Sequence, residues 1–275
     1  MTYRILIGDV FDGLRALPDA SVQCCVTSPP YWGLRDYGVP GQLGLEPTPE
    51  EYAARMVEVF REVRRVLRDD GTLWLVLGDS YAASGNGGNP PESQYQKQAR
   101  NAGSLIPGRK APQGLKPKDL VGIPWRVAFA LQADGWYLRQ DIIWHKPNPM
   151  PESVTDRCCK SHEYVFLLAK SERYFYDAEA VKEDATDCKP RPAKKADRWN
   201  GQAGHDTKAG FLKGKPAYFT RNRRSVWTVA TQSYSEAHFA TFPEEIPRRC
   251  ILAGTSARGA SPSLCRRTVG ICGRI

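Results

Sequence analysis

Residues 48–80 contain the feature that most constrains the fold, an amphipathic helix joined to a wholly apolar strand. Thr48 and Glu51 form a T-x-x-E capping box, and apolar side chains then recur at helical spacing up to Leu67. The run TLWLVLGDS (72–80) lacks polar alternation, which is typical of a strand buried on both faces. A buried strand packed against helices predicts a parallel sheet in an α/β layered fold.

Other segments repeat this alternation. We expect strands at 5–9, 22–28, 136–146, 163–171 and 224–229, and helices at 10–17 and 123–133. A stretch rich in Gly, Pro, Asn and Gln separates the halves and predicts a mobile loop at 82–118. The expected organisation is a catalytic α/β domain over 1–177, an insertion over 178–225, and a return to the first domain over 226–275.

Composition excludes several classes of protein. Seven Trp and twelve Tyr among 275 residues are too many large apolar side chains for a disordered chain. No stretch approaches the ~20 apolar residues of a membrane helix, and MTYRILIGDV lacks a secretory cleavage site. The eight cysteines include no C-x-x-C pair, which indicates reduced structural thiols rather than disulfides or a metal site. We therefore expect an intracellular protein without a metal.

Positive charge is concentrated in one stretch. Residues 185–225 hold eleven basic side chains against three acidic ones, with Trp, Tyr and Phe interleaved. Cations and aromatic faces together favour binding to nucleic acid, although a solvated basic loop is the alternative. The candidate DNA-binding residues are Lys194, Lys195, Arg198, Lys213, Lys215, Arg221, Arg223 and Arg224.

The chemistry concentrates in TSPPYW (27–32), at the end of the second expected strand. Ser28 offers a hydroxyl, Pro29 a carbonyl, and the two prolines stiffen the backbone that holds these oxygens. Tyr31 and Trp32 add flat aromatic faces. Ligands bind at the carboxyl ends of strands in open α/β sheets, so this corner predicts a receptacle for a planar amino-bearing group such as a nucleobase. The alternative is a Pro-terminated strand whose aromatics join the core.

TSPPYW resembles the catalytic motif of the amino-group DNA methyltransferases, which transfer a methyl from S-adenosylmethionine to N6 of adenine or N4 of cytosine. The opening segment is similar to the β-type arrangement, in which this motif lies near the N-terminus. Three later segments, 141–151, 162–177 and 226–246, follow in family order. The resemblance covers roughly residues 3–255 and implies a Rossmann-like S-adenosylmethionine-dependent methyltransferase sheet with a basic insertion.

The resemblance also implies roles for single residues of the motif. Ser28 and the Pro29 carbonyl would accept hydrogen bonds from the target amine, and Pro30 would stiffen the turn. Tyr31 would stack on the base after it is flipped from duplex DNA, which costs a few kcal/mol.

The same resemblance points to a set of cofactor contacts. Gly78 and Asp79 are weaker candidates for the pocket wall. For Asp9 a helix N-cap and for His238 a partly buried histidine remain open as alternatives. The cofactor-binding residues expected from the resemblance are Asp9, His238, Phe239 and Pro243.

Serine in the first motif position resembles the N4-cytosine enzymes more than the N6-adenine ones, so we expect N4-cytosine methylation. N6-adenine methylation and an RNA or protein amide methyltransferase are the alternatives. No Pro-Cys dipeptide occurs, which excludes the carbon-5 chemistry of cytosine. A cognate restriction endonuclease is not expected to be required for activity. The expected location is the cytoplasm, at the nucleoid of a prokaryotic or phage-type system.

One segment departs from the family pattern. The Gly-rich F-x-G-x-G loop that cradles the cofactor's methionine part should follow HFATFPEEI, but LAGTS (252–256) lacks this spacing and a basic tail follows. We expect a frameshift or truncation near residue 258, which would leave out two strands of the family sheet and half of the cofactor site. The alternative function is then a catalytically inactive DNA-binding remnant.

Overall fold

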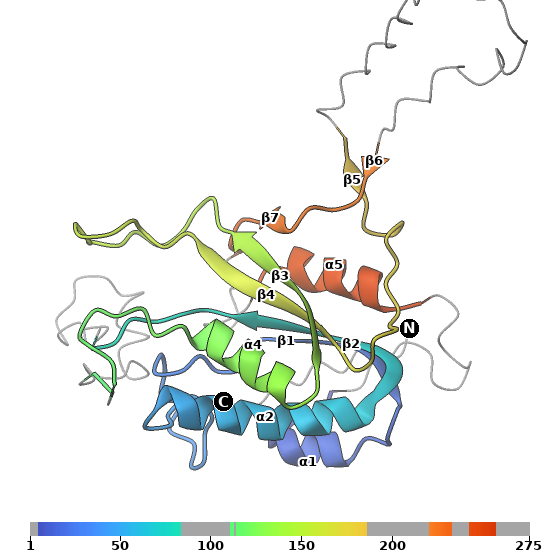
Figure 1. Cartoon of the computed structure of the whole chain (residues 1–275), viewed down its shortest axis with the longest axis horizontal. Coiled ribbons are helices and arrows are strands. Elements are labelled where there is room, and N and C mark those ends of the chain that lie inside the picture. Colours follow the sequence, from blue (N-terminus) through green and yellow to red (C-terminus); the bar gives the residue numbers. More distant parts are fainter. Residues whose placement is uncertain (1–4, 84–110, 113, 186–219, 233–241, 257–275) are drawn as a thin grey trace, which may run out of the picture. The chain divides into compact units, whose positions relative to one another are not determined.

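A computed structural model describes residues 5–83, 111–112, 114–185, 220–232 and 242–256 (Figure 1). The chain divides into two units, one formed by residues 1–177 with 225–275 and the other by 178–224. Most of the loop expected at 82–118 lies outside the described residues. The second unit contains a two-stranded antiparallel ladder, β5 (Glu183–Asp184) with β6 (Thr220–Arg221).

The first unit is built on a five-stranded sheet in the order β1-β2-β4-β3-β7. Its strands are β1 (Val22–Thr27), β2 (Leu67–Leu77), β3 (Tyr137–His145), β4 (His162–Ala169) and β7 (Val226–Thr228). The pairs β1–β2 and β3–β7 are parallel, whereas β4 is antiparallel to both β2 and β3. The sheet is therefore mixed, and the prediction of a parallel sheet is wrong.

The physical reason for this error lies in the connection between β3 and β4. Residues 146–161 join the two strands without a helix, and a parallel pair would need a crossover connection. β4 is buried without interruption from Val165 to Ala169, as a parallel strand would be, because both of its faces are covered. The apolar pattern of β4 therefore indicates that the strand is buried, but it does not indicate whether the strand runs parallel or antiparallel to its neighbours.

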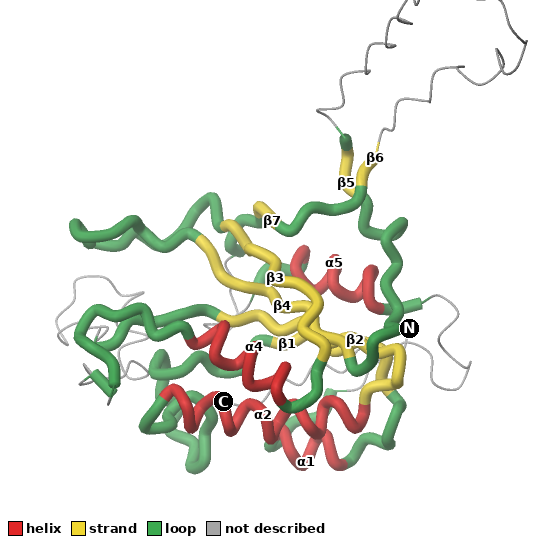
Figure 2. Tube along the Cα trace, in the orientation of Figure 1, coloured by secondary structure: helices red, strands yellow, loops and turns green. Residues whose placement is uncertain are grey.

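Helices cover both faces of the sheet. Figure 1 shows α1, α2 and α4 on one side and α5 on the other, and Figure 2 shows the same layers by element type. The helices are α1 (Val10–Arg15), α2 (Pro49–Val66), α4 (Ile123–Ala133) and α5 (Glu245–Gly254). Within the described parts of the chain, no helix has both the length and the apolar character to span a membrane.

The helix predicted at 48–67 is confirmed. Thr48 caps α2, with its Oγ1 accepting a hydrogen bond from the Glu51 amide at 3.1 Å. β2 begins directly after this helix at Leu67, five residues earlier than expected, because Leu67 pairs with Val22 of β1. The helix predicted at 123–133 has the bounds of α4.

The strand predicted at 5–9 is not present. Residues 5–9 precede α1 and pair with no strand among the residues that the structure describes. Ile5 and Ile7 are 64% and 66% exposed, whereas Leu6 packs against the core. A short apolar run becomes a strand only where a partner edge supplies hydrogen bonds.

Alternate residues of β2 face the two helical layers. Leu73, Leu75 and Leu77 belong to the core shared with α2 and α4. On the other face, α5 approaches so closely that a Cβ added at Gly254 would lie 2.7 Å from Thr72 Oγ1 and 2.8 Å from Cys24 Sγ. Burial of the Cys24 side chain in this layer raises its pKa to about 12, which fits a structural thiol.

We therefore expect Gly254→Ala to destabilise the fold by about 1–3 kcal/mol, because the added methyl overpacks the contact between α5 and β2. Gly13→Ala is the matched control, since its Cβ would meet nothing within 4 Å in α1. This control is expected to be neutral or to stabilise by up to about 1 kcal/mol. Denaturant unfolding of both variants measures the difference, and equal midpoints would contradict the close packing of α5.

Candidate active site at the carboxyl end of strand β1

The motif Ser28–Tyr31 follows directly after β1 and forms the corner at its carboxyl end. The corner is anchored to α2, because the fully buried Tyr52 donates a hydrogen bond from its Oη to the Pro30 carbonyl at 2.8 Å. Among the described residues, no hydrogen bond to the Pro29 carbonyl is present.

The ring of Tyr31 is held by the carboxyl end of the neighbouring strand β2. A Cβ added at Gly78 would lie 2.6 Å from Tyr31 Cε2, so only glycine lets the ring lie there. The Tyr31 hydroxyl donates to Glu163 Oε2 at 2.8 Å. Tyr31 is partly buried, and its pKa is raised well above the usual value by burial and then by the negative charge of Glu163. The phenol therefore stays protonated and acts as a donor.

This contact gives a prediction for Gly78→Ala. The methyl should push the Tyr31 ring from its place, and a misplacement of about 1 Å at a reacting centre can cost about 100-fold in turnover. We expect that loss in methylation rate together with a loss of stability of about 1–3 kcal/mol, because the added methyl overpacks this contact as it does at Gly254. Gly13→Ala controls for the added methyl. Unchanged turnover in Gly78→Ala would show that the position of the ring is unimportant.

Two charged residues that the sequence reasoning missed complete the corner. Lys146, just after β3, forms an ion pair with Glu163 Oε1, and Glu163 lies at the start of β4. The Lys146 ammonium also lies 4.4 Å from the centroid of the Trp144 ring. Both side chains are mostly buried, with exposed fractions of 19% and 16%. The signal for them was a lysine directly after one strand and an acid opening a strand that is otherwise apolar.

Asp79, a weaker candidate for the pocket wall, has a structural role. Its Oδ1 accepts hydrogen bonds from the amides of Gly122 and Ile123 at 2.9 and 3.0 Å and so caps α4. Its carbonyl accepts a hydrogen bond from Lys160 Nζ at 2.9 Å. Burial of Lys160 lowers its pKa, against the opposing effect of Asp79 and Glu163.

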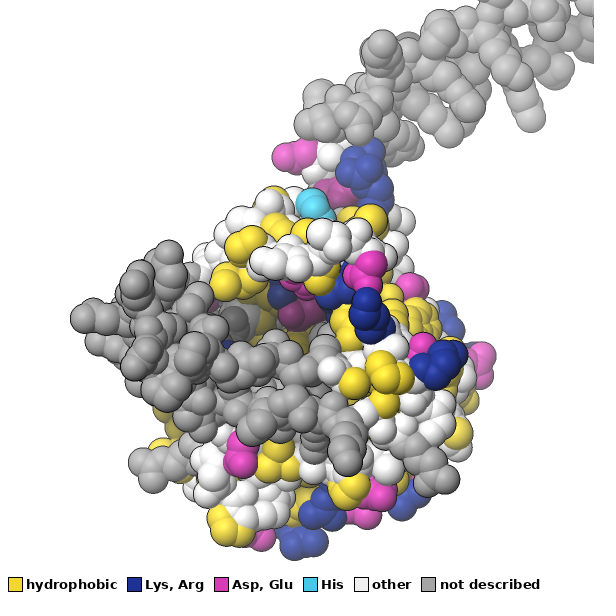
Figure 3. All heavy atoms as spheres, turned by 90° about the vertical axis from the view of Figure 1, so that its left-hand side faces the viewer, with side chains coloured by type: hydrophobic (Ala, Val, Ile, Leu, Met, Phe, Trp, Pro, Cys, Tyr) yellow, Lys and Arg dark blue, Asp and Glu magenta, His cyan; other side chains and the backbone are white. Residues whose placement is uncertain are grey.

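Trp32 was predicted to supply an open aromatic face, but the structure places it in the core. It is 4% exposed, and its Nε1 donates to the Glu46 carbonyl at 2.9 Å. Of the two aromatics in the motif, Trp32 belongs to the core and Tyr31 to the corner. Figure 3 looks onto the end of the sheet toward which β1 and β2 run, and this face is hollowed, with basic and acidic side chains inside the hollow.

Of the expected cofactor contacts, His238 and Phe239 lie outside the described residues. Asp9 is exposed and caps α1 by accepting a hydrogen bond from the Phe11 amide at 2.8 Å. Pro243 is buried just before α5. The surface depression lined by Asp9 includes no residue of the Ser28–Tyr31 corner. The cofactor roles of Asp9 and Pro243 stay predictions.

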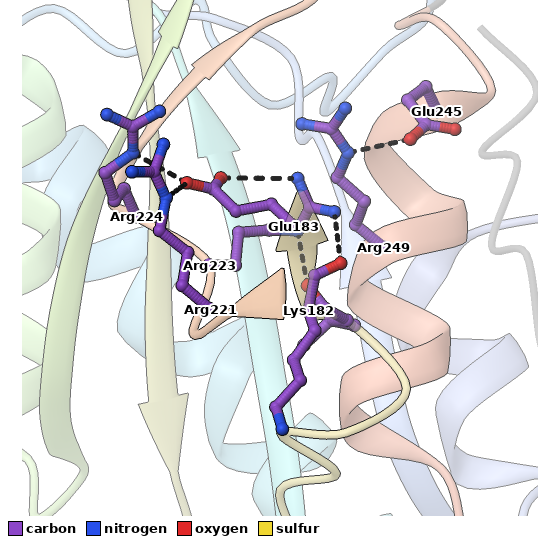
Figure 4. Close-up of polar contacts among 8 residues, drawn as sticks. Lys182, Glu183, Arg221, Arg223, Arg224, Glu245 and Arg249 are labelled. Atoms are coloured by element: carbon purple, nitrogen blue, oxygen red, sulfur yellow. Dashed lines mark hydrogen bonds and ion pairs between the residues drawn. The ribbon is translucent and has the colours of Figure 1, made fainter. Parts of the chain in front are cut away.

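Three of the expected DNA-binding residues are described, all in the second unit. Figure 4 shows Arg221 and Arg224 directed at Glu183, whose Oε1 they reach at 2.8 and 2.6 Å. Arg223 donates to the Val181 carbonyl at 2.7 Å. Burial tends to raise the pKa of Glu183, but the hydrogen bonds from Arg221 and Arg224 outweigh it and lower the pKa. The three guanidinium groups share one carboxylate, and Arg224 is the most exposed of them at 64%.

The other five of these cations, from Lys194 to Lys215, lie outside the described residues. Figure 4 also shows a separate ion pair within the first unit, where Arg249 and Glu245 of α5 meet at 2.8 Å one helical turn apart. The DNA-binding role of the basic segment is not tested by these contacts and stays a prediction.

Comparison with known proteins places the chain in a family. A family model described as a DNA methylase, for N6 and N4 methyltransferases, matches residues 22–260. The chain is 50% identical to type II methyltransferase M.Cfr9I of Citrobacter freundii over 248 residues, which are 90% of this chain and 71% of that protein. It is 46% identical to type II methyltransferase M.SmaI of Serratia marcescens over 257 residues, covering 93% of this chain and 76% of that protein.

A solved structure shares the fold. The PvuII cytosine-N4-specific DNA methyltransferase superposes with a TM-score of 0.56 at 16% identity, over 93% of this chain and 71% of that one. The α/β fold with a motif corner at the end of β1 agrees with the match of the family model over most of the sequence. The chain therefore belongs to the DNA methylase family, the S-adenosylmethionine-dependent enzymes that methylate amino groups of DNA bases.

Proposed function

We propose that this chain methylates the exocyclic N4 amine of cytosine at a specific site in duplex DNA. The observation that carries the proposal is the corner after β1, where Ser28 Oγ lies 3.4 Å from Tyr31 Oη and Pro29 follows Ser28 directly in the chain. The corner is braced by Tyr52 and by the close contact between Tyr31 and Gly78. A braced pair of acceptors fits an NH₂ group, which has two hydrogens to donate.

The chemistry follows from the weak nucleophilicity of an aromatic amine, whose lone pair is delocalised into the ring. Hydrogen bonds from both N–H groups to Ser28 and Pro29 favour a pyramidal nitrogen and aim its lone pair outward. S-adenosylmethionine supplies the methyl group when it is bound. The chain contributes position and electrostatic stabilisation, and no covalent intermediate on the protein is needed.

The base is proposed from the first motif residue. A hydroxyl at Ser28, rather than a carboxylate, resembles the N4-cytosine members of the family. N6-adenine is the second candidate, because the two acceptors can hold either exocyclic amine. No cognate restriction endonuclease is proposed to be necessary for the transfer itself.

The test uses the purified 275-residue chain, S-adenosylmethionine and unmethylated plasmid DNA. Enzymatic digestion followed by nucleoside mass spectrometry is expected to find N4-methylcytosine. N6-methyladenine would instead establish the second candidate. If neither forms, calorimetry with S-adenosylmethionine decides the reason. Absence of saturable binding would support the inactive remnant, and binding without methylation would overturn the proposed reaction.

The basic insertion at 178–225 is proposed to contact the DNA backbone. Charge neutralisation of phosphates makes affinity fall steeply with salt, so binding of duplex DNA should weaken about 1000-fold or more between 50 and 200 mM salt if six or more phosphates are contacted. Removing positive charge at the exposed Arg224 by Arg224→Gln should reduce this salt dependence slightly. Affinity that is insensitive to salt would exclude the phosphate role.

A further inference from the structure

Ser28 raises a chemical problem for the proposed function. A carboxylate in its place could only accept hydrogen bonds, whereas a hydroxyl both donates and accepts. If the Ser28 proton pointed at the target amine, two donors would face each other. Something in the chain must decide where that proton points.

The number of hydroxyl hydrogens at the corner determines where the Ser28 proton points. Tyr31 has one hydroxyl hydrogen, and it is committed to Glu163 Oε2 at 2.8 Å. Toward Ser28, Tyr31 Oη can then only accept. Ser28 Oγ donates its one hydrogen to Tyr31 Oη over 3.4 Å, a long hydrogen bond, and both of its lone pairs remain for a ligand.

Lys146 holds the other oxygen of Glu163. Its ammonium pairs with Glu163 Oε1, which leaves Oε2 for Tyr31. Glu163 has an exposed fraction of 16%, and Lys146 supplies the opposite charge that a carboxylate removed from most of the solvent needs. Because a carboxylate has only acceptor oxygens, Glu163 accepts from the Tyr31 hydroxyl, and Tyr31 Oη in turn accepts from Ser28 Oγ.

We infer that Lys146, Glu163 and the Tyr31 hydroxyl are positioning groups that make Ser28 an obligate acceptor for the target amine. This inference rests on the proposed function. It adds a hydrogen-bond arrangement that lets a hydroxyl accept from the target amine as a carboxylate would. Lys146 and Glu163 come from the adjacent ends of β3 and β4, and the pairing of His145 with His162 brings them together. The hydrogen-bond arrangement therefore depends on the antiparallel pairing of β3 and β4, which the sequence pattern did not predict.

The test compares two nucleosides that differ where the amine binds. 2′-Deoxycytidine carries an amine at position 4, and 2′-deoxyuridine carries a carbonyl there. Dissociation constants by NMR titration require neither methyl transfer nor cofactor. The unmodified chain should prefer deoxycytidine by more than about fivefold, because Ser28 and the Pro29 carbonyl each supply about one net hydrogen bond. Tyr31→Phe and Glu163→Gln free the Ser28 proton, so the preference should fall by about fivefold, to the part that the Pro29 carbonyl supplies.

Two lysines supply a matched control. Lys146 and Lys170 have the same exposed fraction of 19%, and each forms an ion pair, Lys170 with Asp69 at 3.2 Å near the other end of β4. Lys146→Met should lower the deoxycytidine preference, whereas Lys170→Met should leave it unchanged. Thermal melting of all variants identifies any that fail to fold. If Glu163→Gln fails to fold, the comparison rests on Tyr31→Phe.

The outcomes separate the inference from the proposed function. If every variant keeps the deoxycytidine preference of the unmodified chain, the positioning role is wrong and the proposed function stands. If the unmodified chain itself shows no preference, the Ser28 corner does not select an amine, and both fail. A reduced preference confined to the Tyr31, Glu163 and Lys146 variants is the expected result.

Discussion

Ser28→Ala is expected to lower the turnover number for DNA methylation by about 100- to 1000-fold. Removing one preorganised hydrogen-bonding group that acts in the transition state has an effect of this size. Ser28 Oγ is proposed to hold the amine as its nitrogen becomes pyramidal, so the loss should appear mainly in the turnover number. Affinity for duplex DNA should change by less than about threefold, because this contact is a small part of the DNA interface.

Ser21→Ala controls for the chemical change itself. Ser21 precedes the amino end of β1, and its Oγ donates to the Pro18 carbonyl at 2.6 Å, away from the corner. Single-turnover kinetics of both variants, with enzyme in excess over DNA, measure the transfer step directly. A loss below about tenfold in Ser28→Ala, or an equal loss in Ser21→Ala, would remove Ser28 from the proposed mechanism.

Tyr31→Ala is expected to cause the second large loss, about 100-fold in kcat/KM for DNA. Stacking on an aromatic side chain contributes about 1–3 kcal/mol per base, and this energy offsets the cost of flipping the base. The variant also leaves Glu163 Oε2 without its donor and opens space beside Gly78. Because stacking stabilises the flipped base before transfer, the loss should include weaker binding of DNA with a mismatch at the target base.

Tyr137→Ala is the matched control for the loss of a ring. Tyr137 is 44% exposed and lies at the start of β3, whereas Lys146 of the corner follows the end of that strand. Tyr31→Phe, which keeps the ring, should retain most of the DNA affinity. If Tyr31→Ala and Tyr137→Ala bind and methylate DNA equally well, Tyr31 does not stack on the target base.

Local signals in the sequence predicted the parts of the fold that depend on local physics. The capping box at Thr48 and the periodicity that follows it located α2 to within a residue at each end. An apolar run ended by two prolines located the corner after β1. Each of these features is determined by residues that are close in the sequence, and for this reason the sequence alone predicts them.

Pairing between distant segments could not be read in the same way. The direction of β4 depends on the hairpin with β3, and burial on both faces gives the same apolar run in either direction. Trp32 and Tyr31 are adjacent and chemically similar, yet one is in the core and the other at the corner. Glu163 lies 132 residues after Tyr31, so only the folded sheet brings their side chains together.

The most direct measurement of the central claim is a crystal structure of the chain bound to duplex DNA containing its methylation site. The site can first be mapped by sequencing the methylated DNA. We expect a target cytosine turned out of the duplex, its amine bonded to Ser28 Oγ and the Pro29 carbonyl, and its ring on Tyr31. A target base still stacked in the duplex, or held away from residues 28–31, would contradict it.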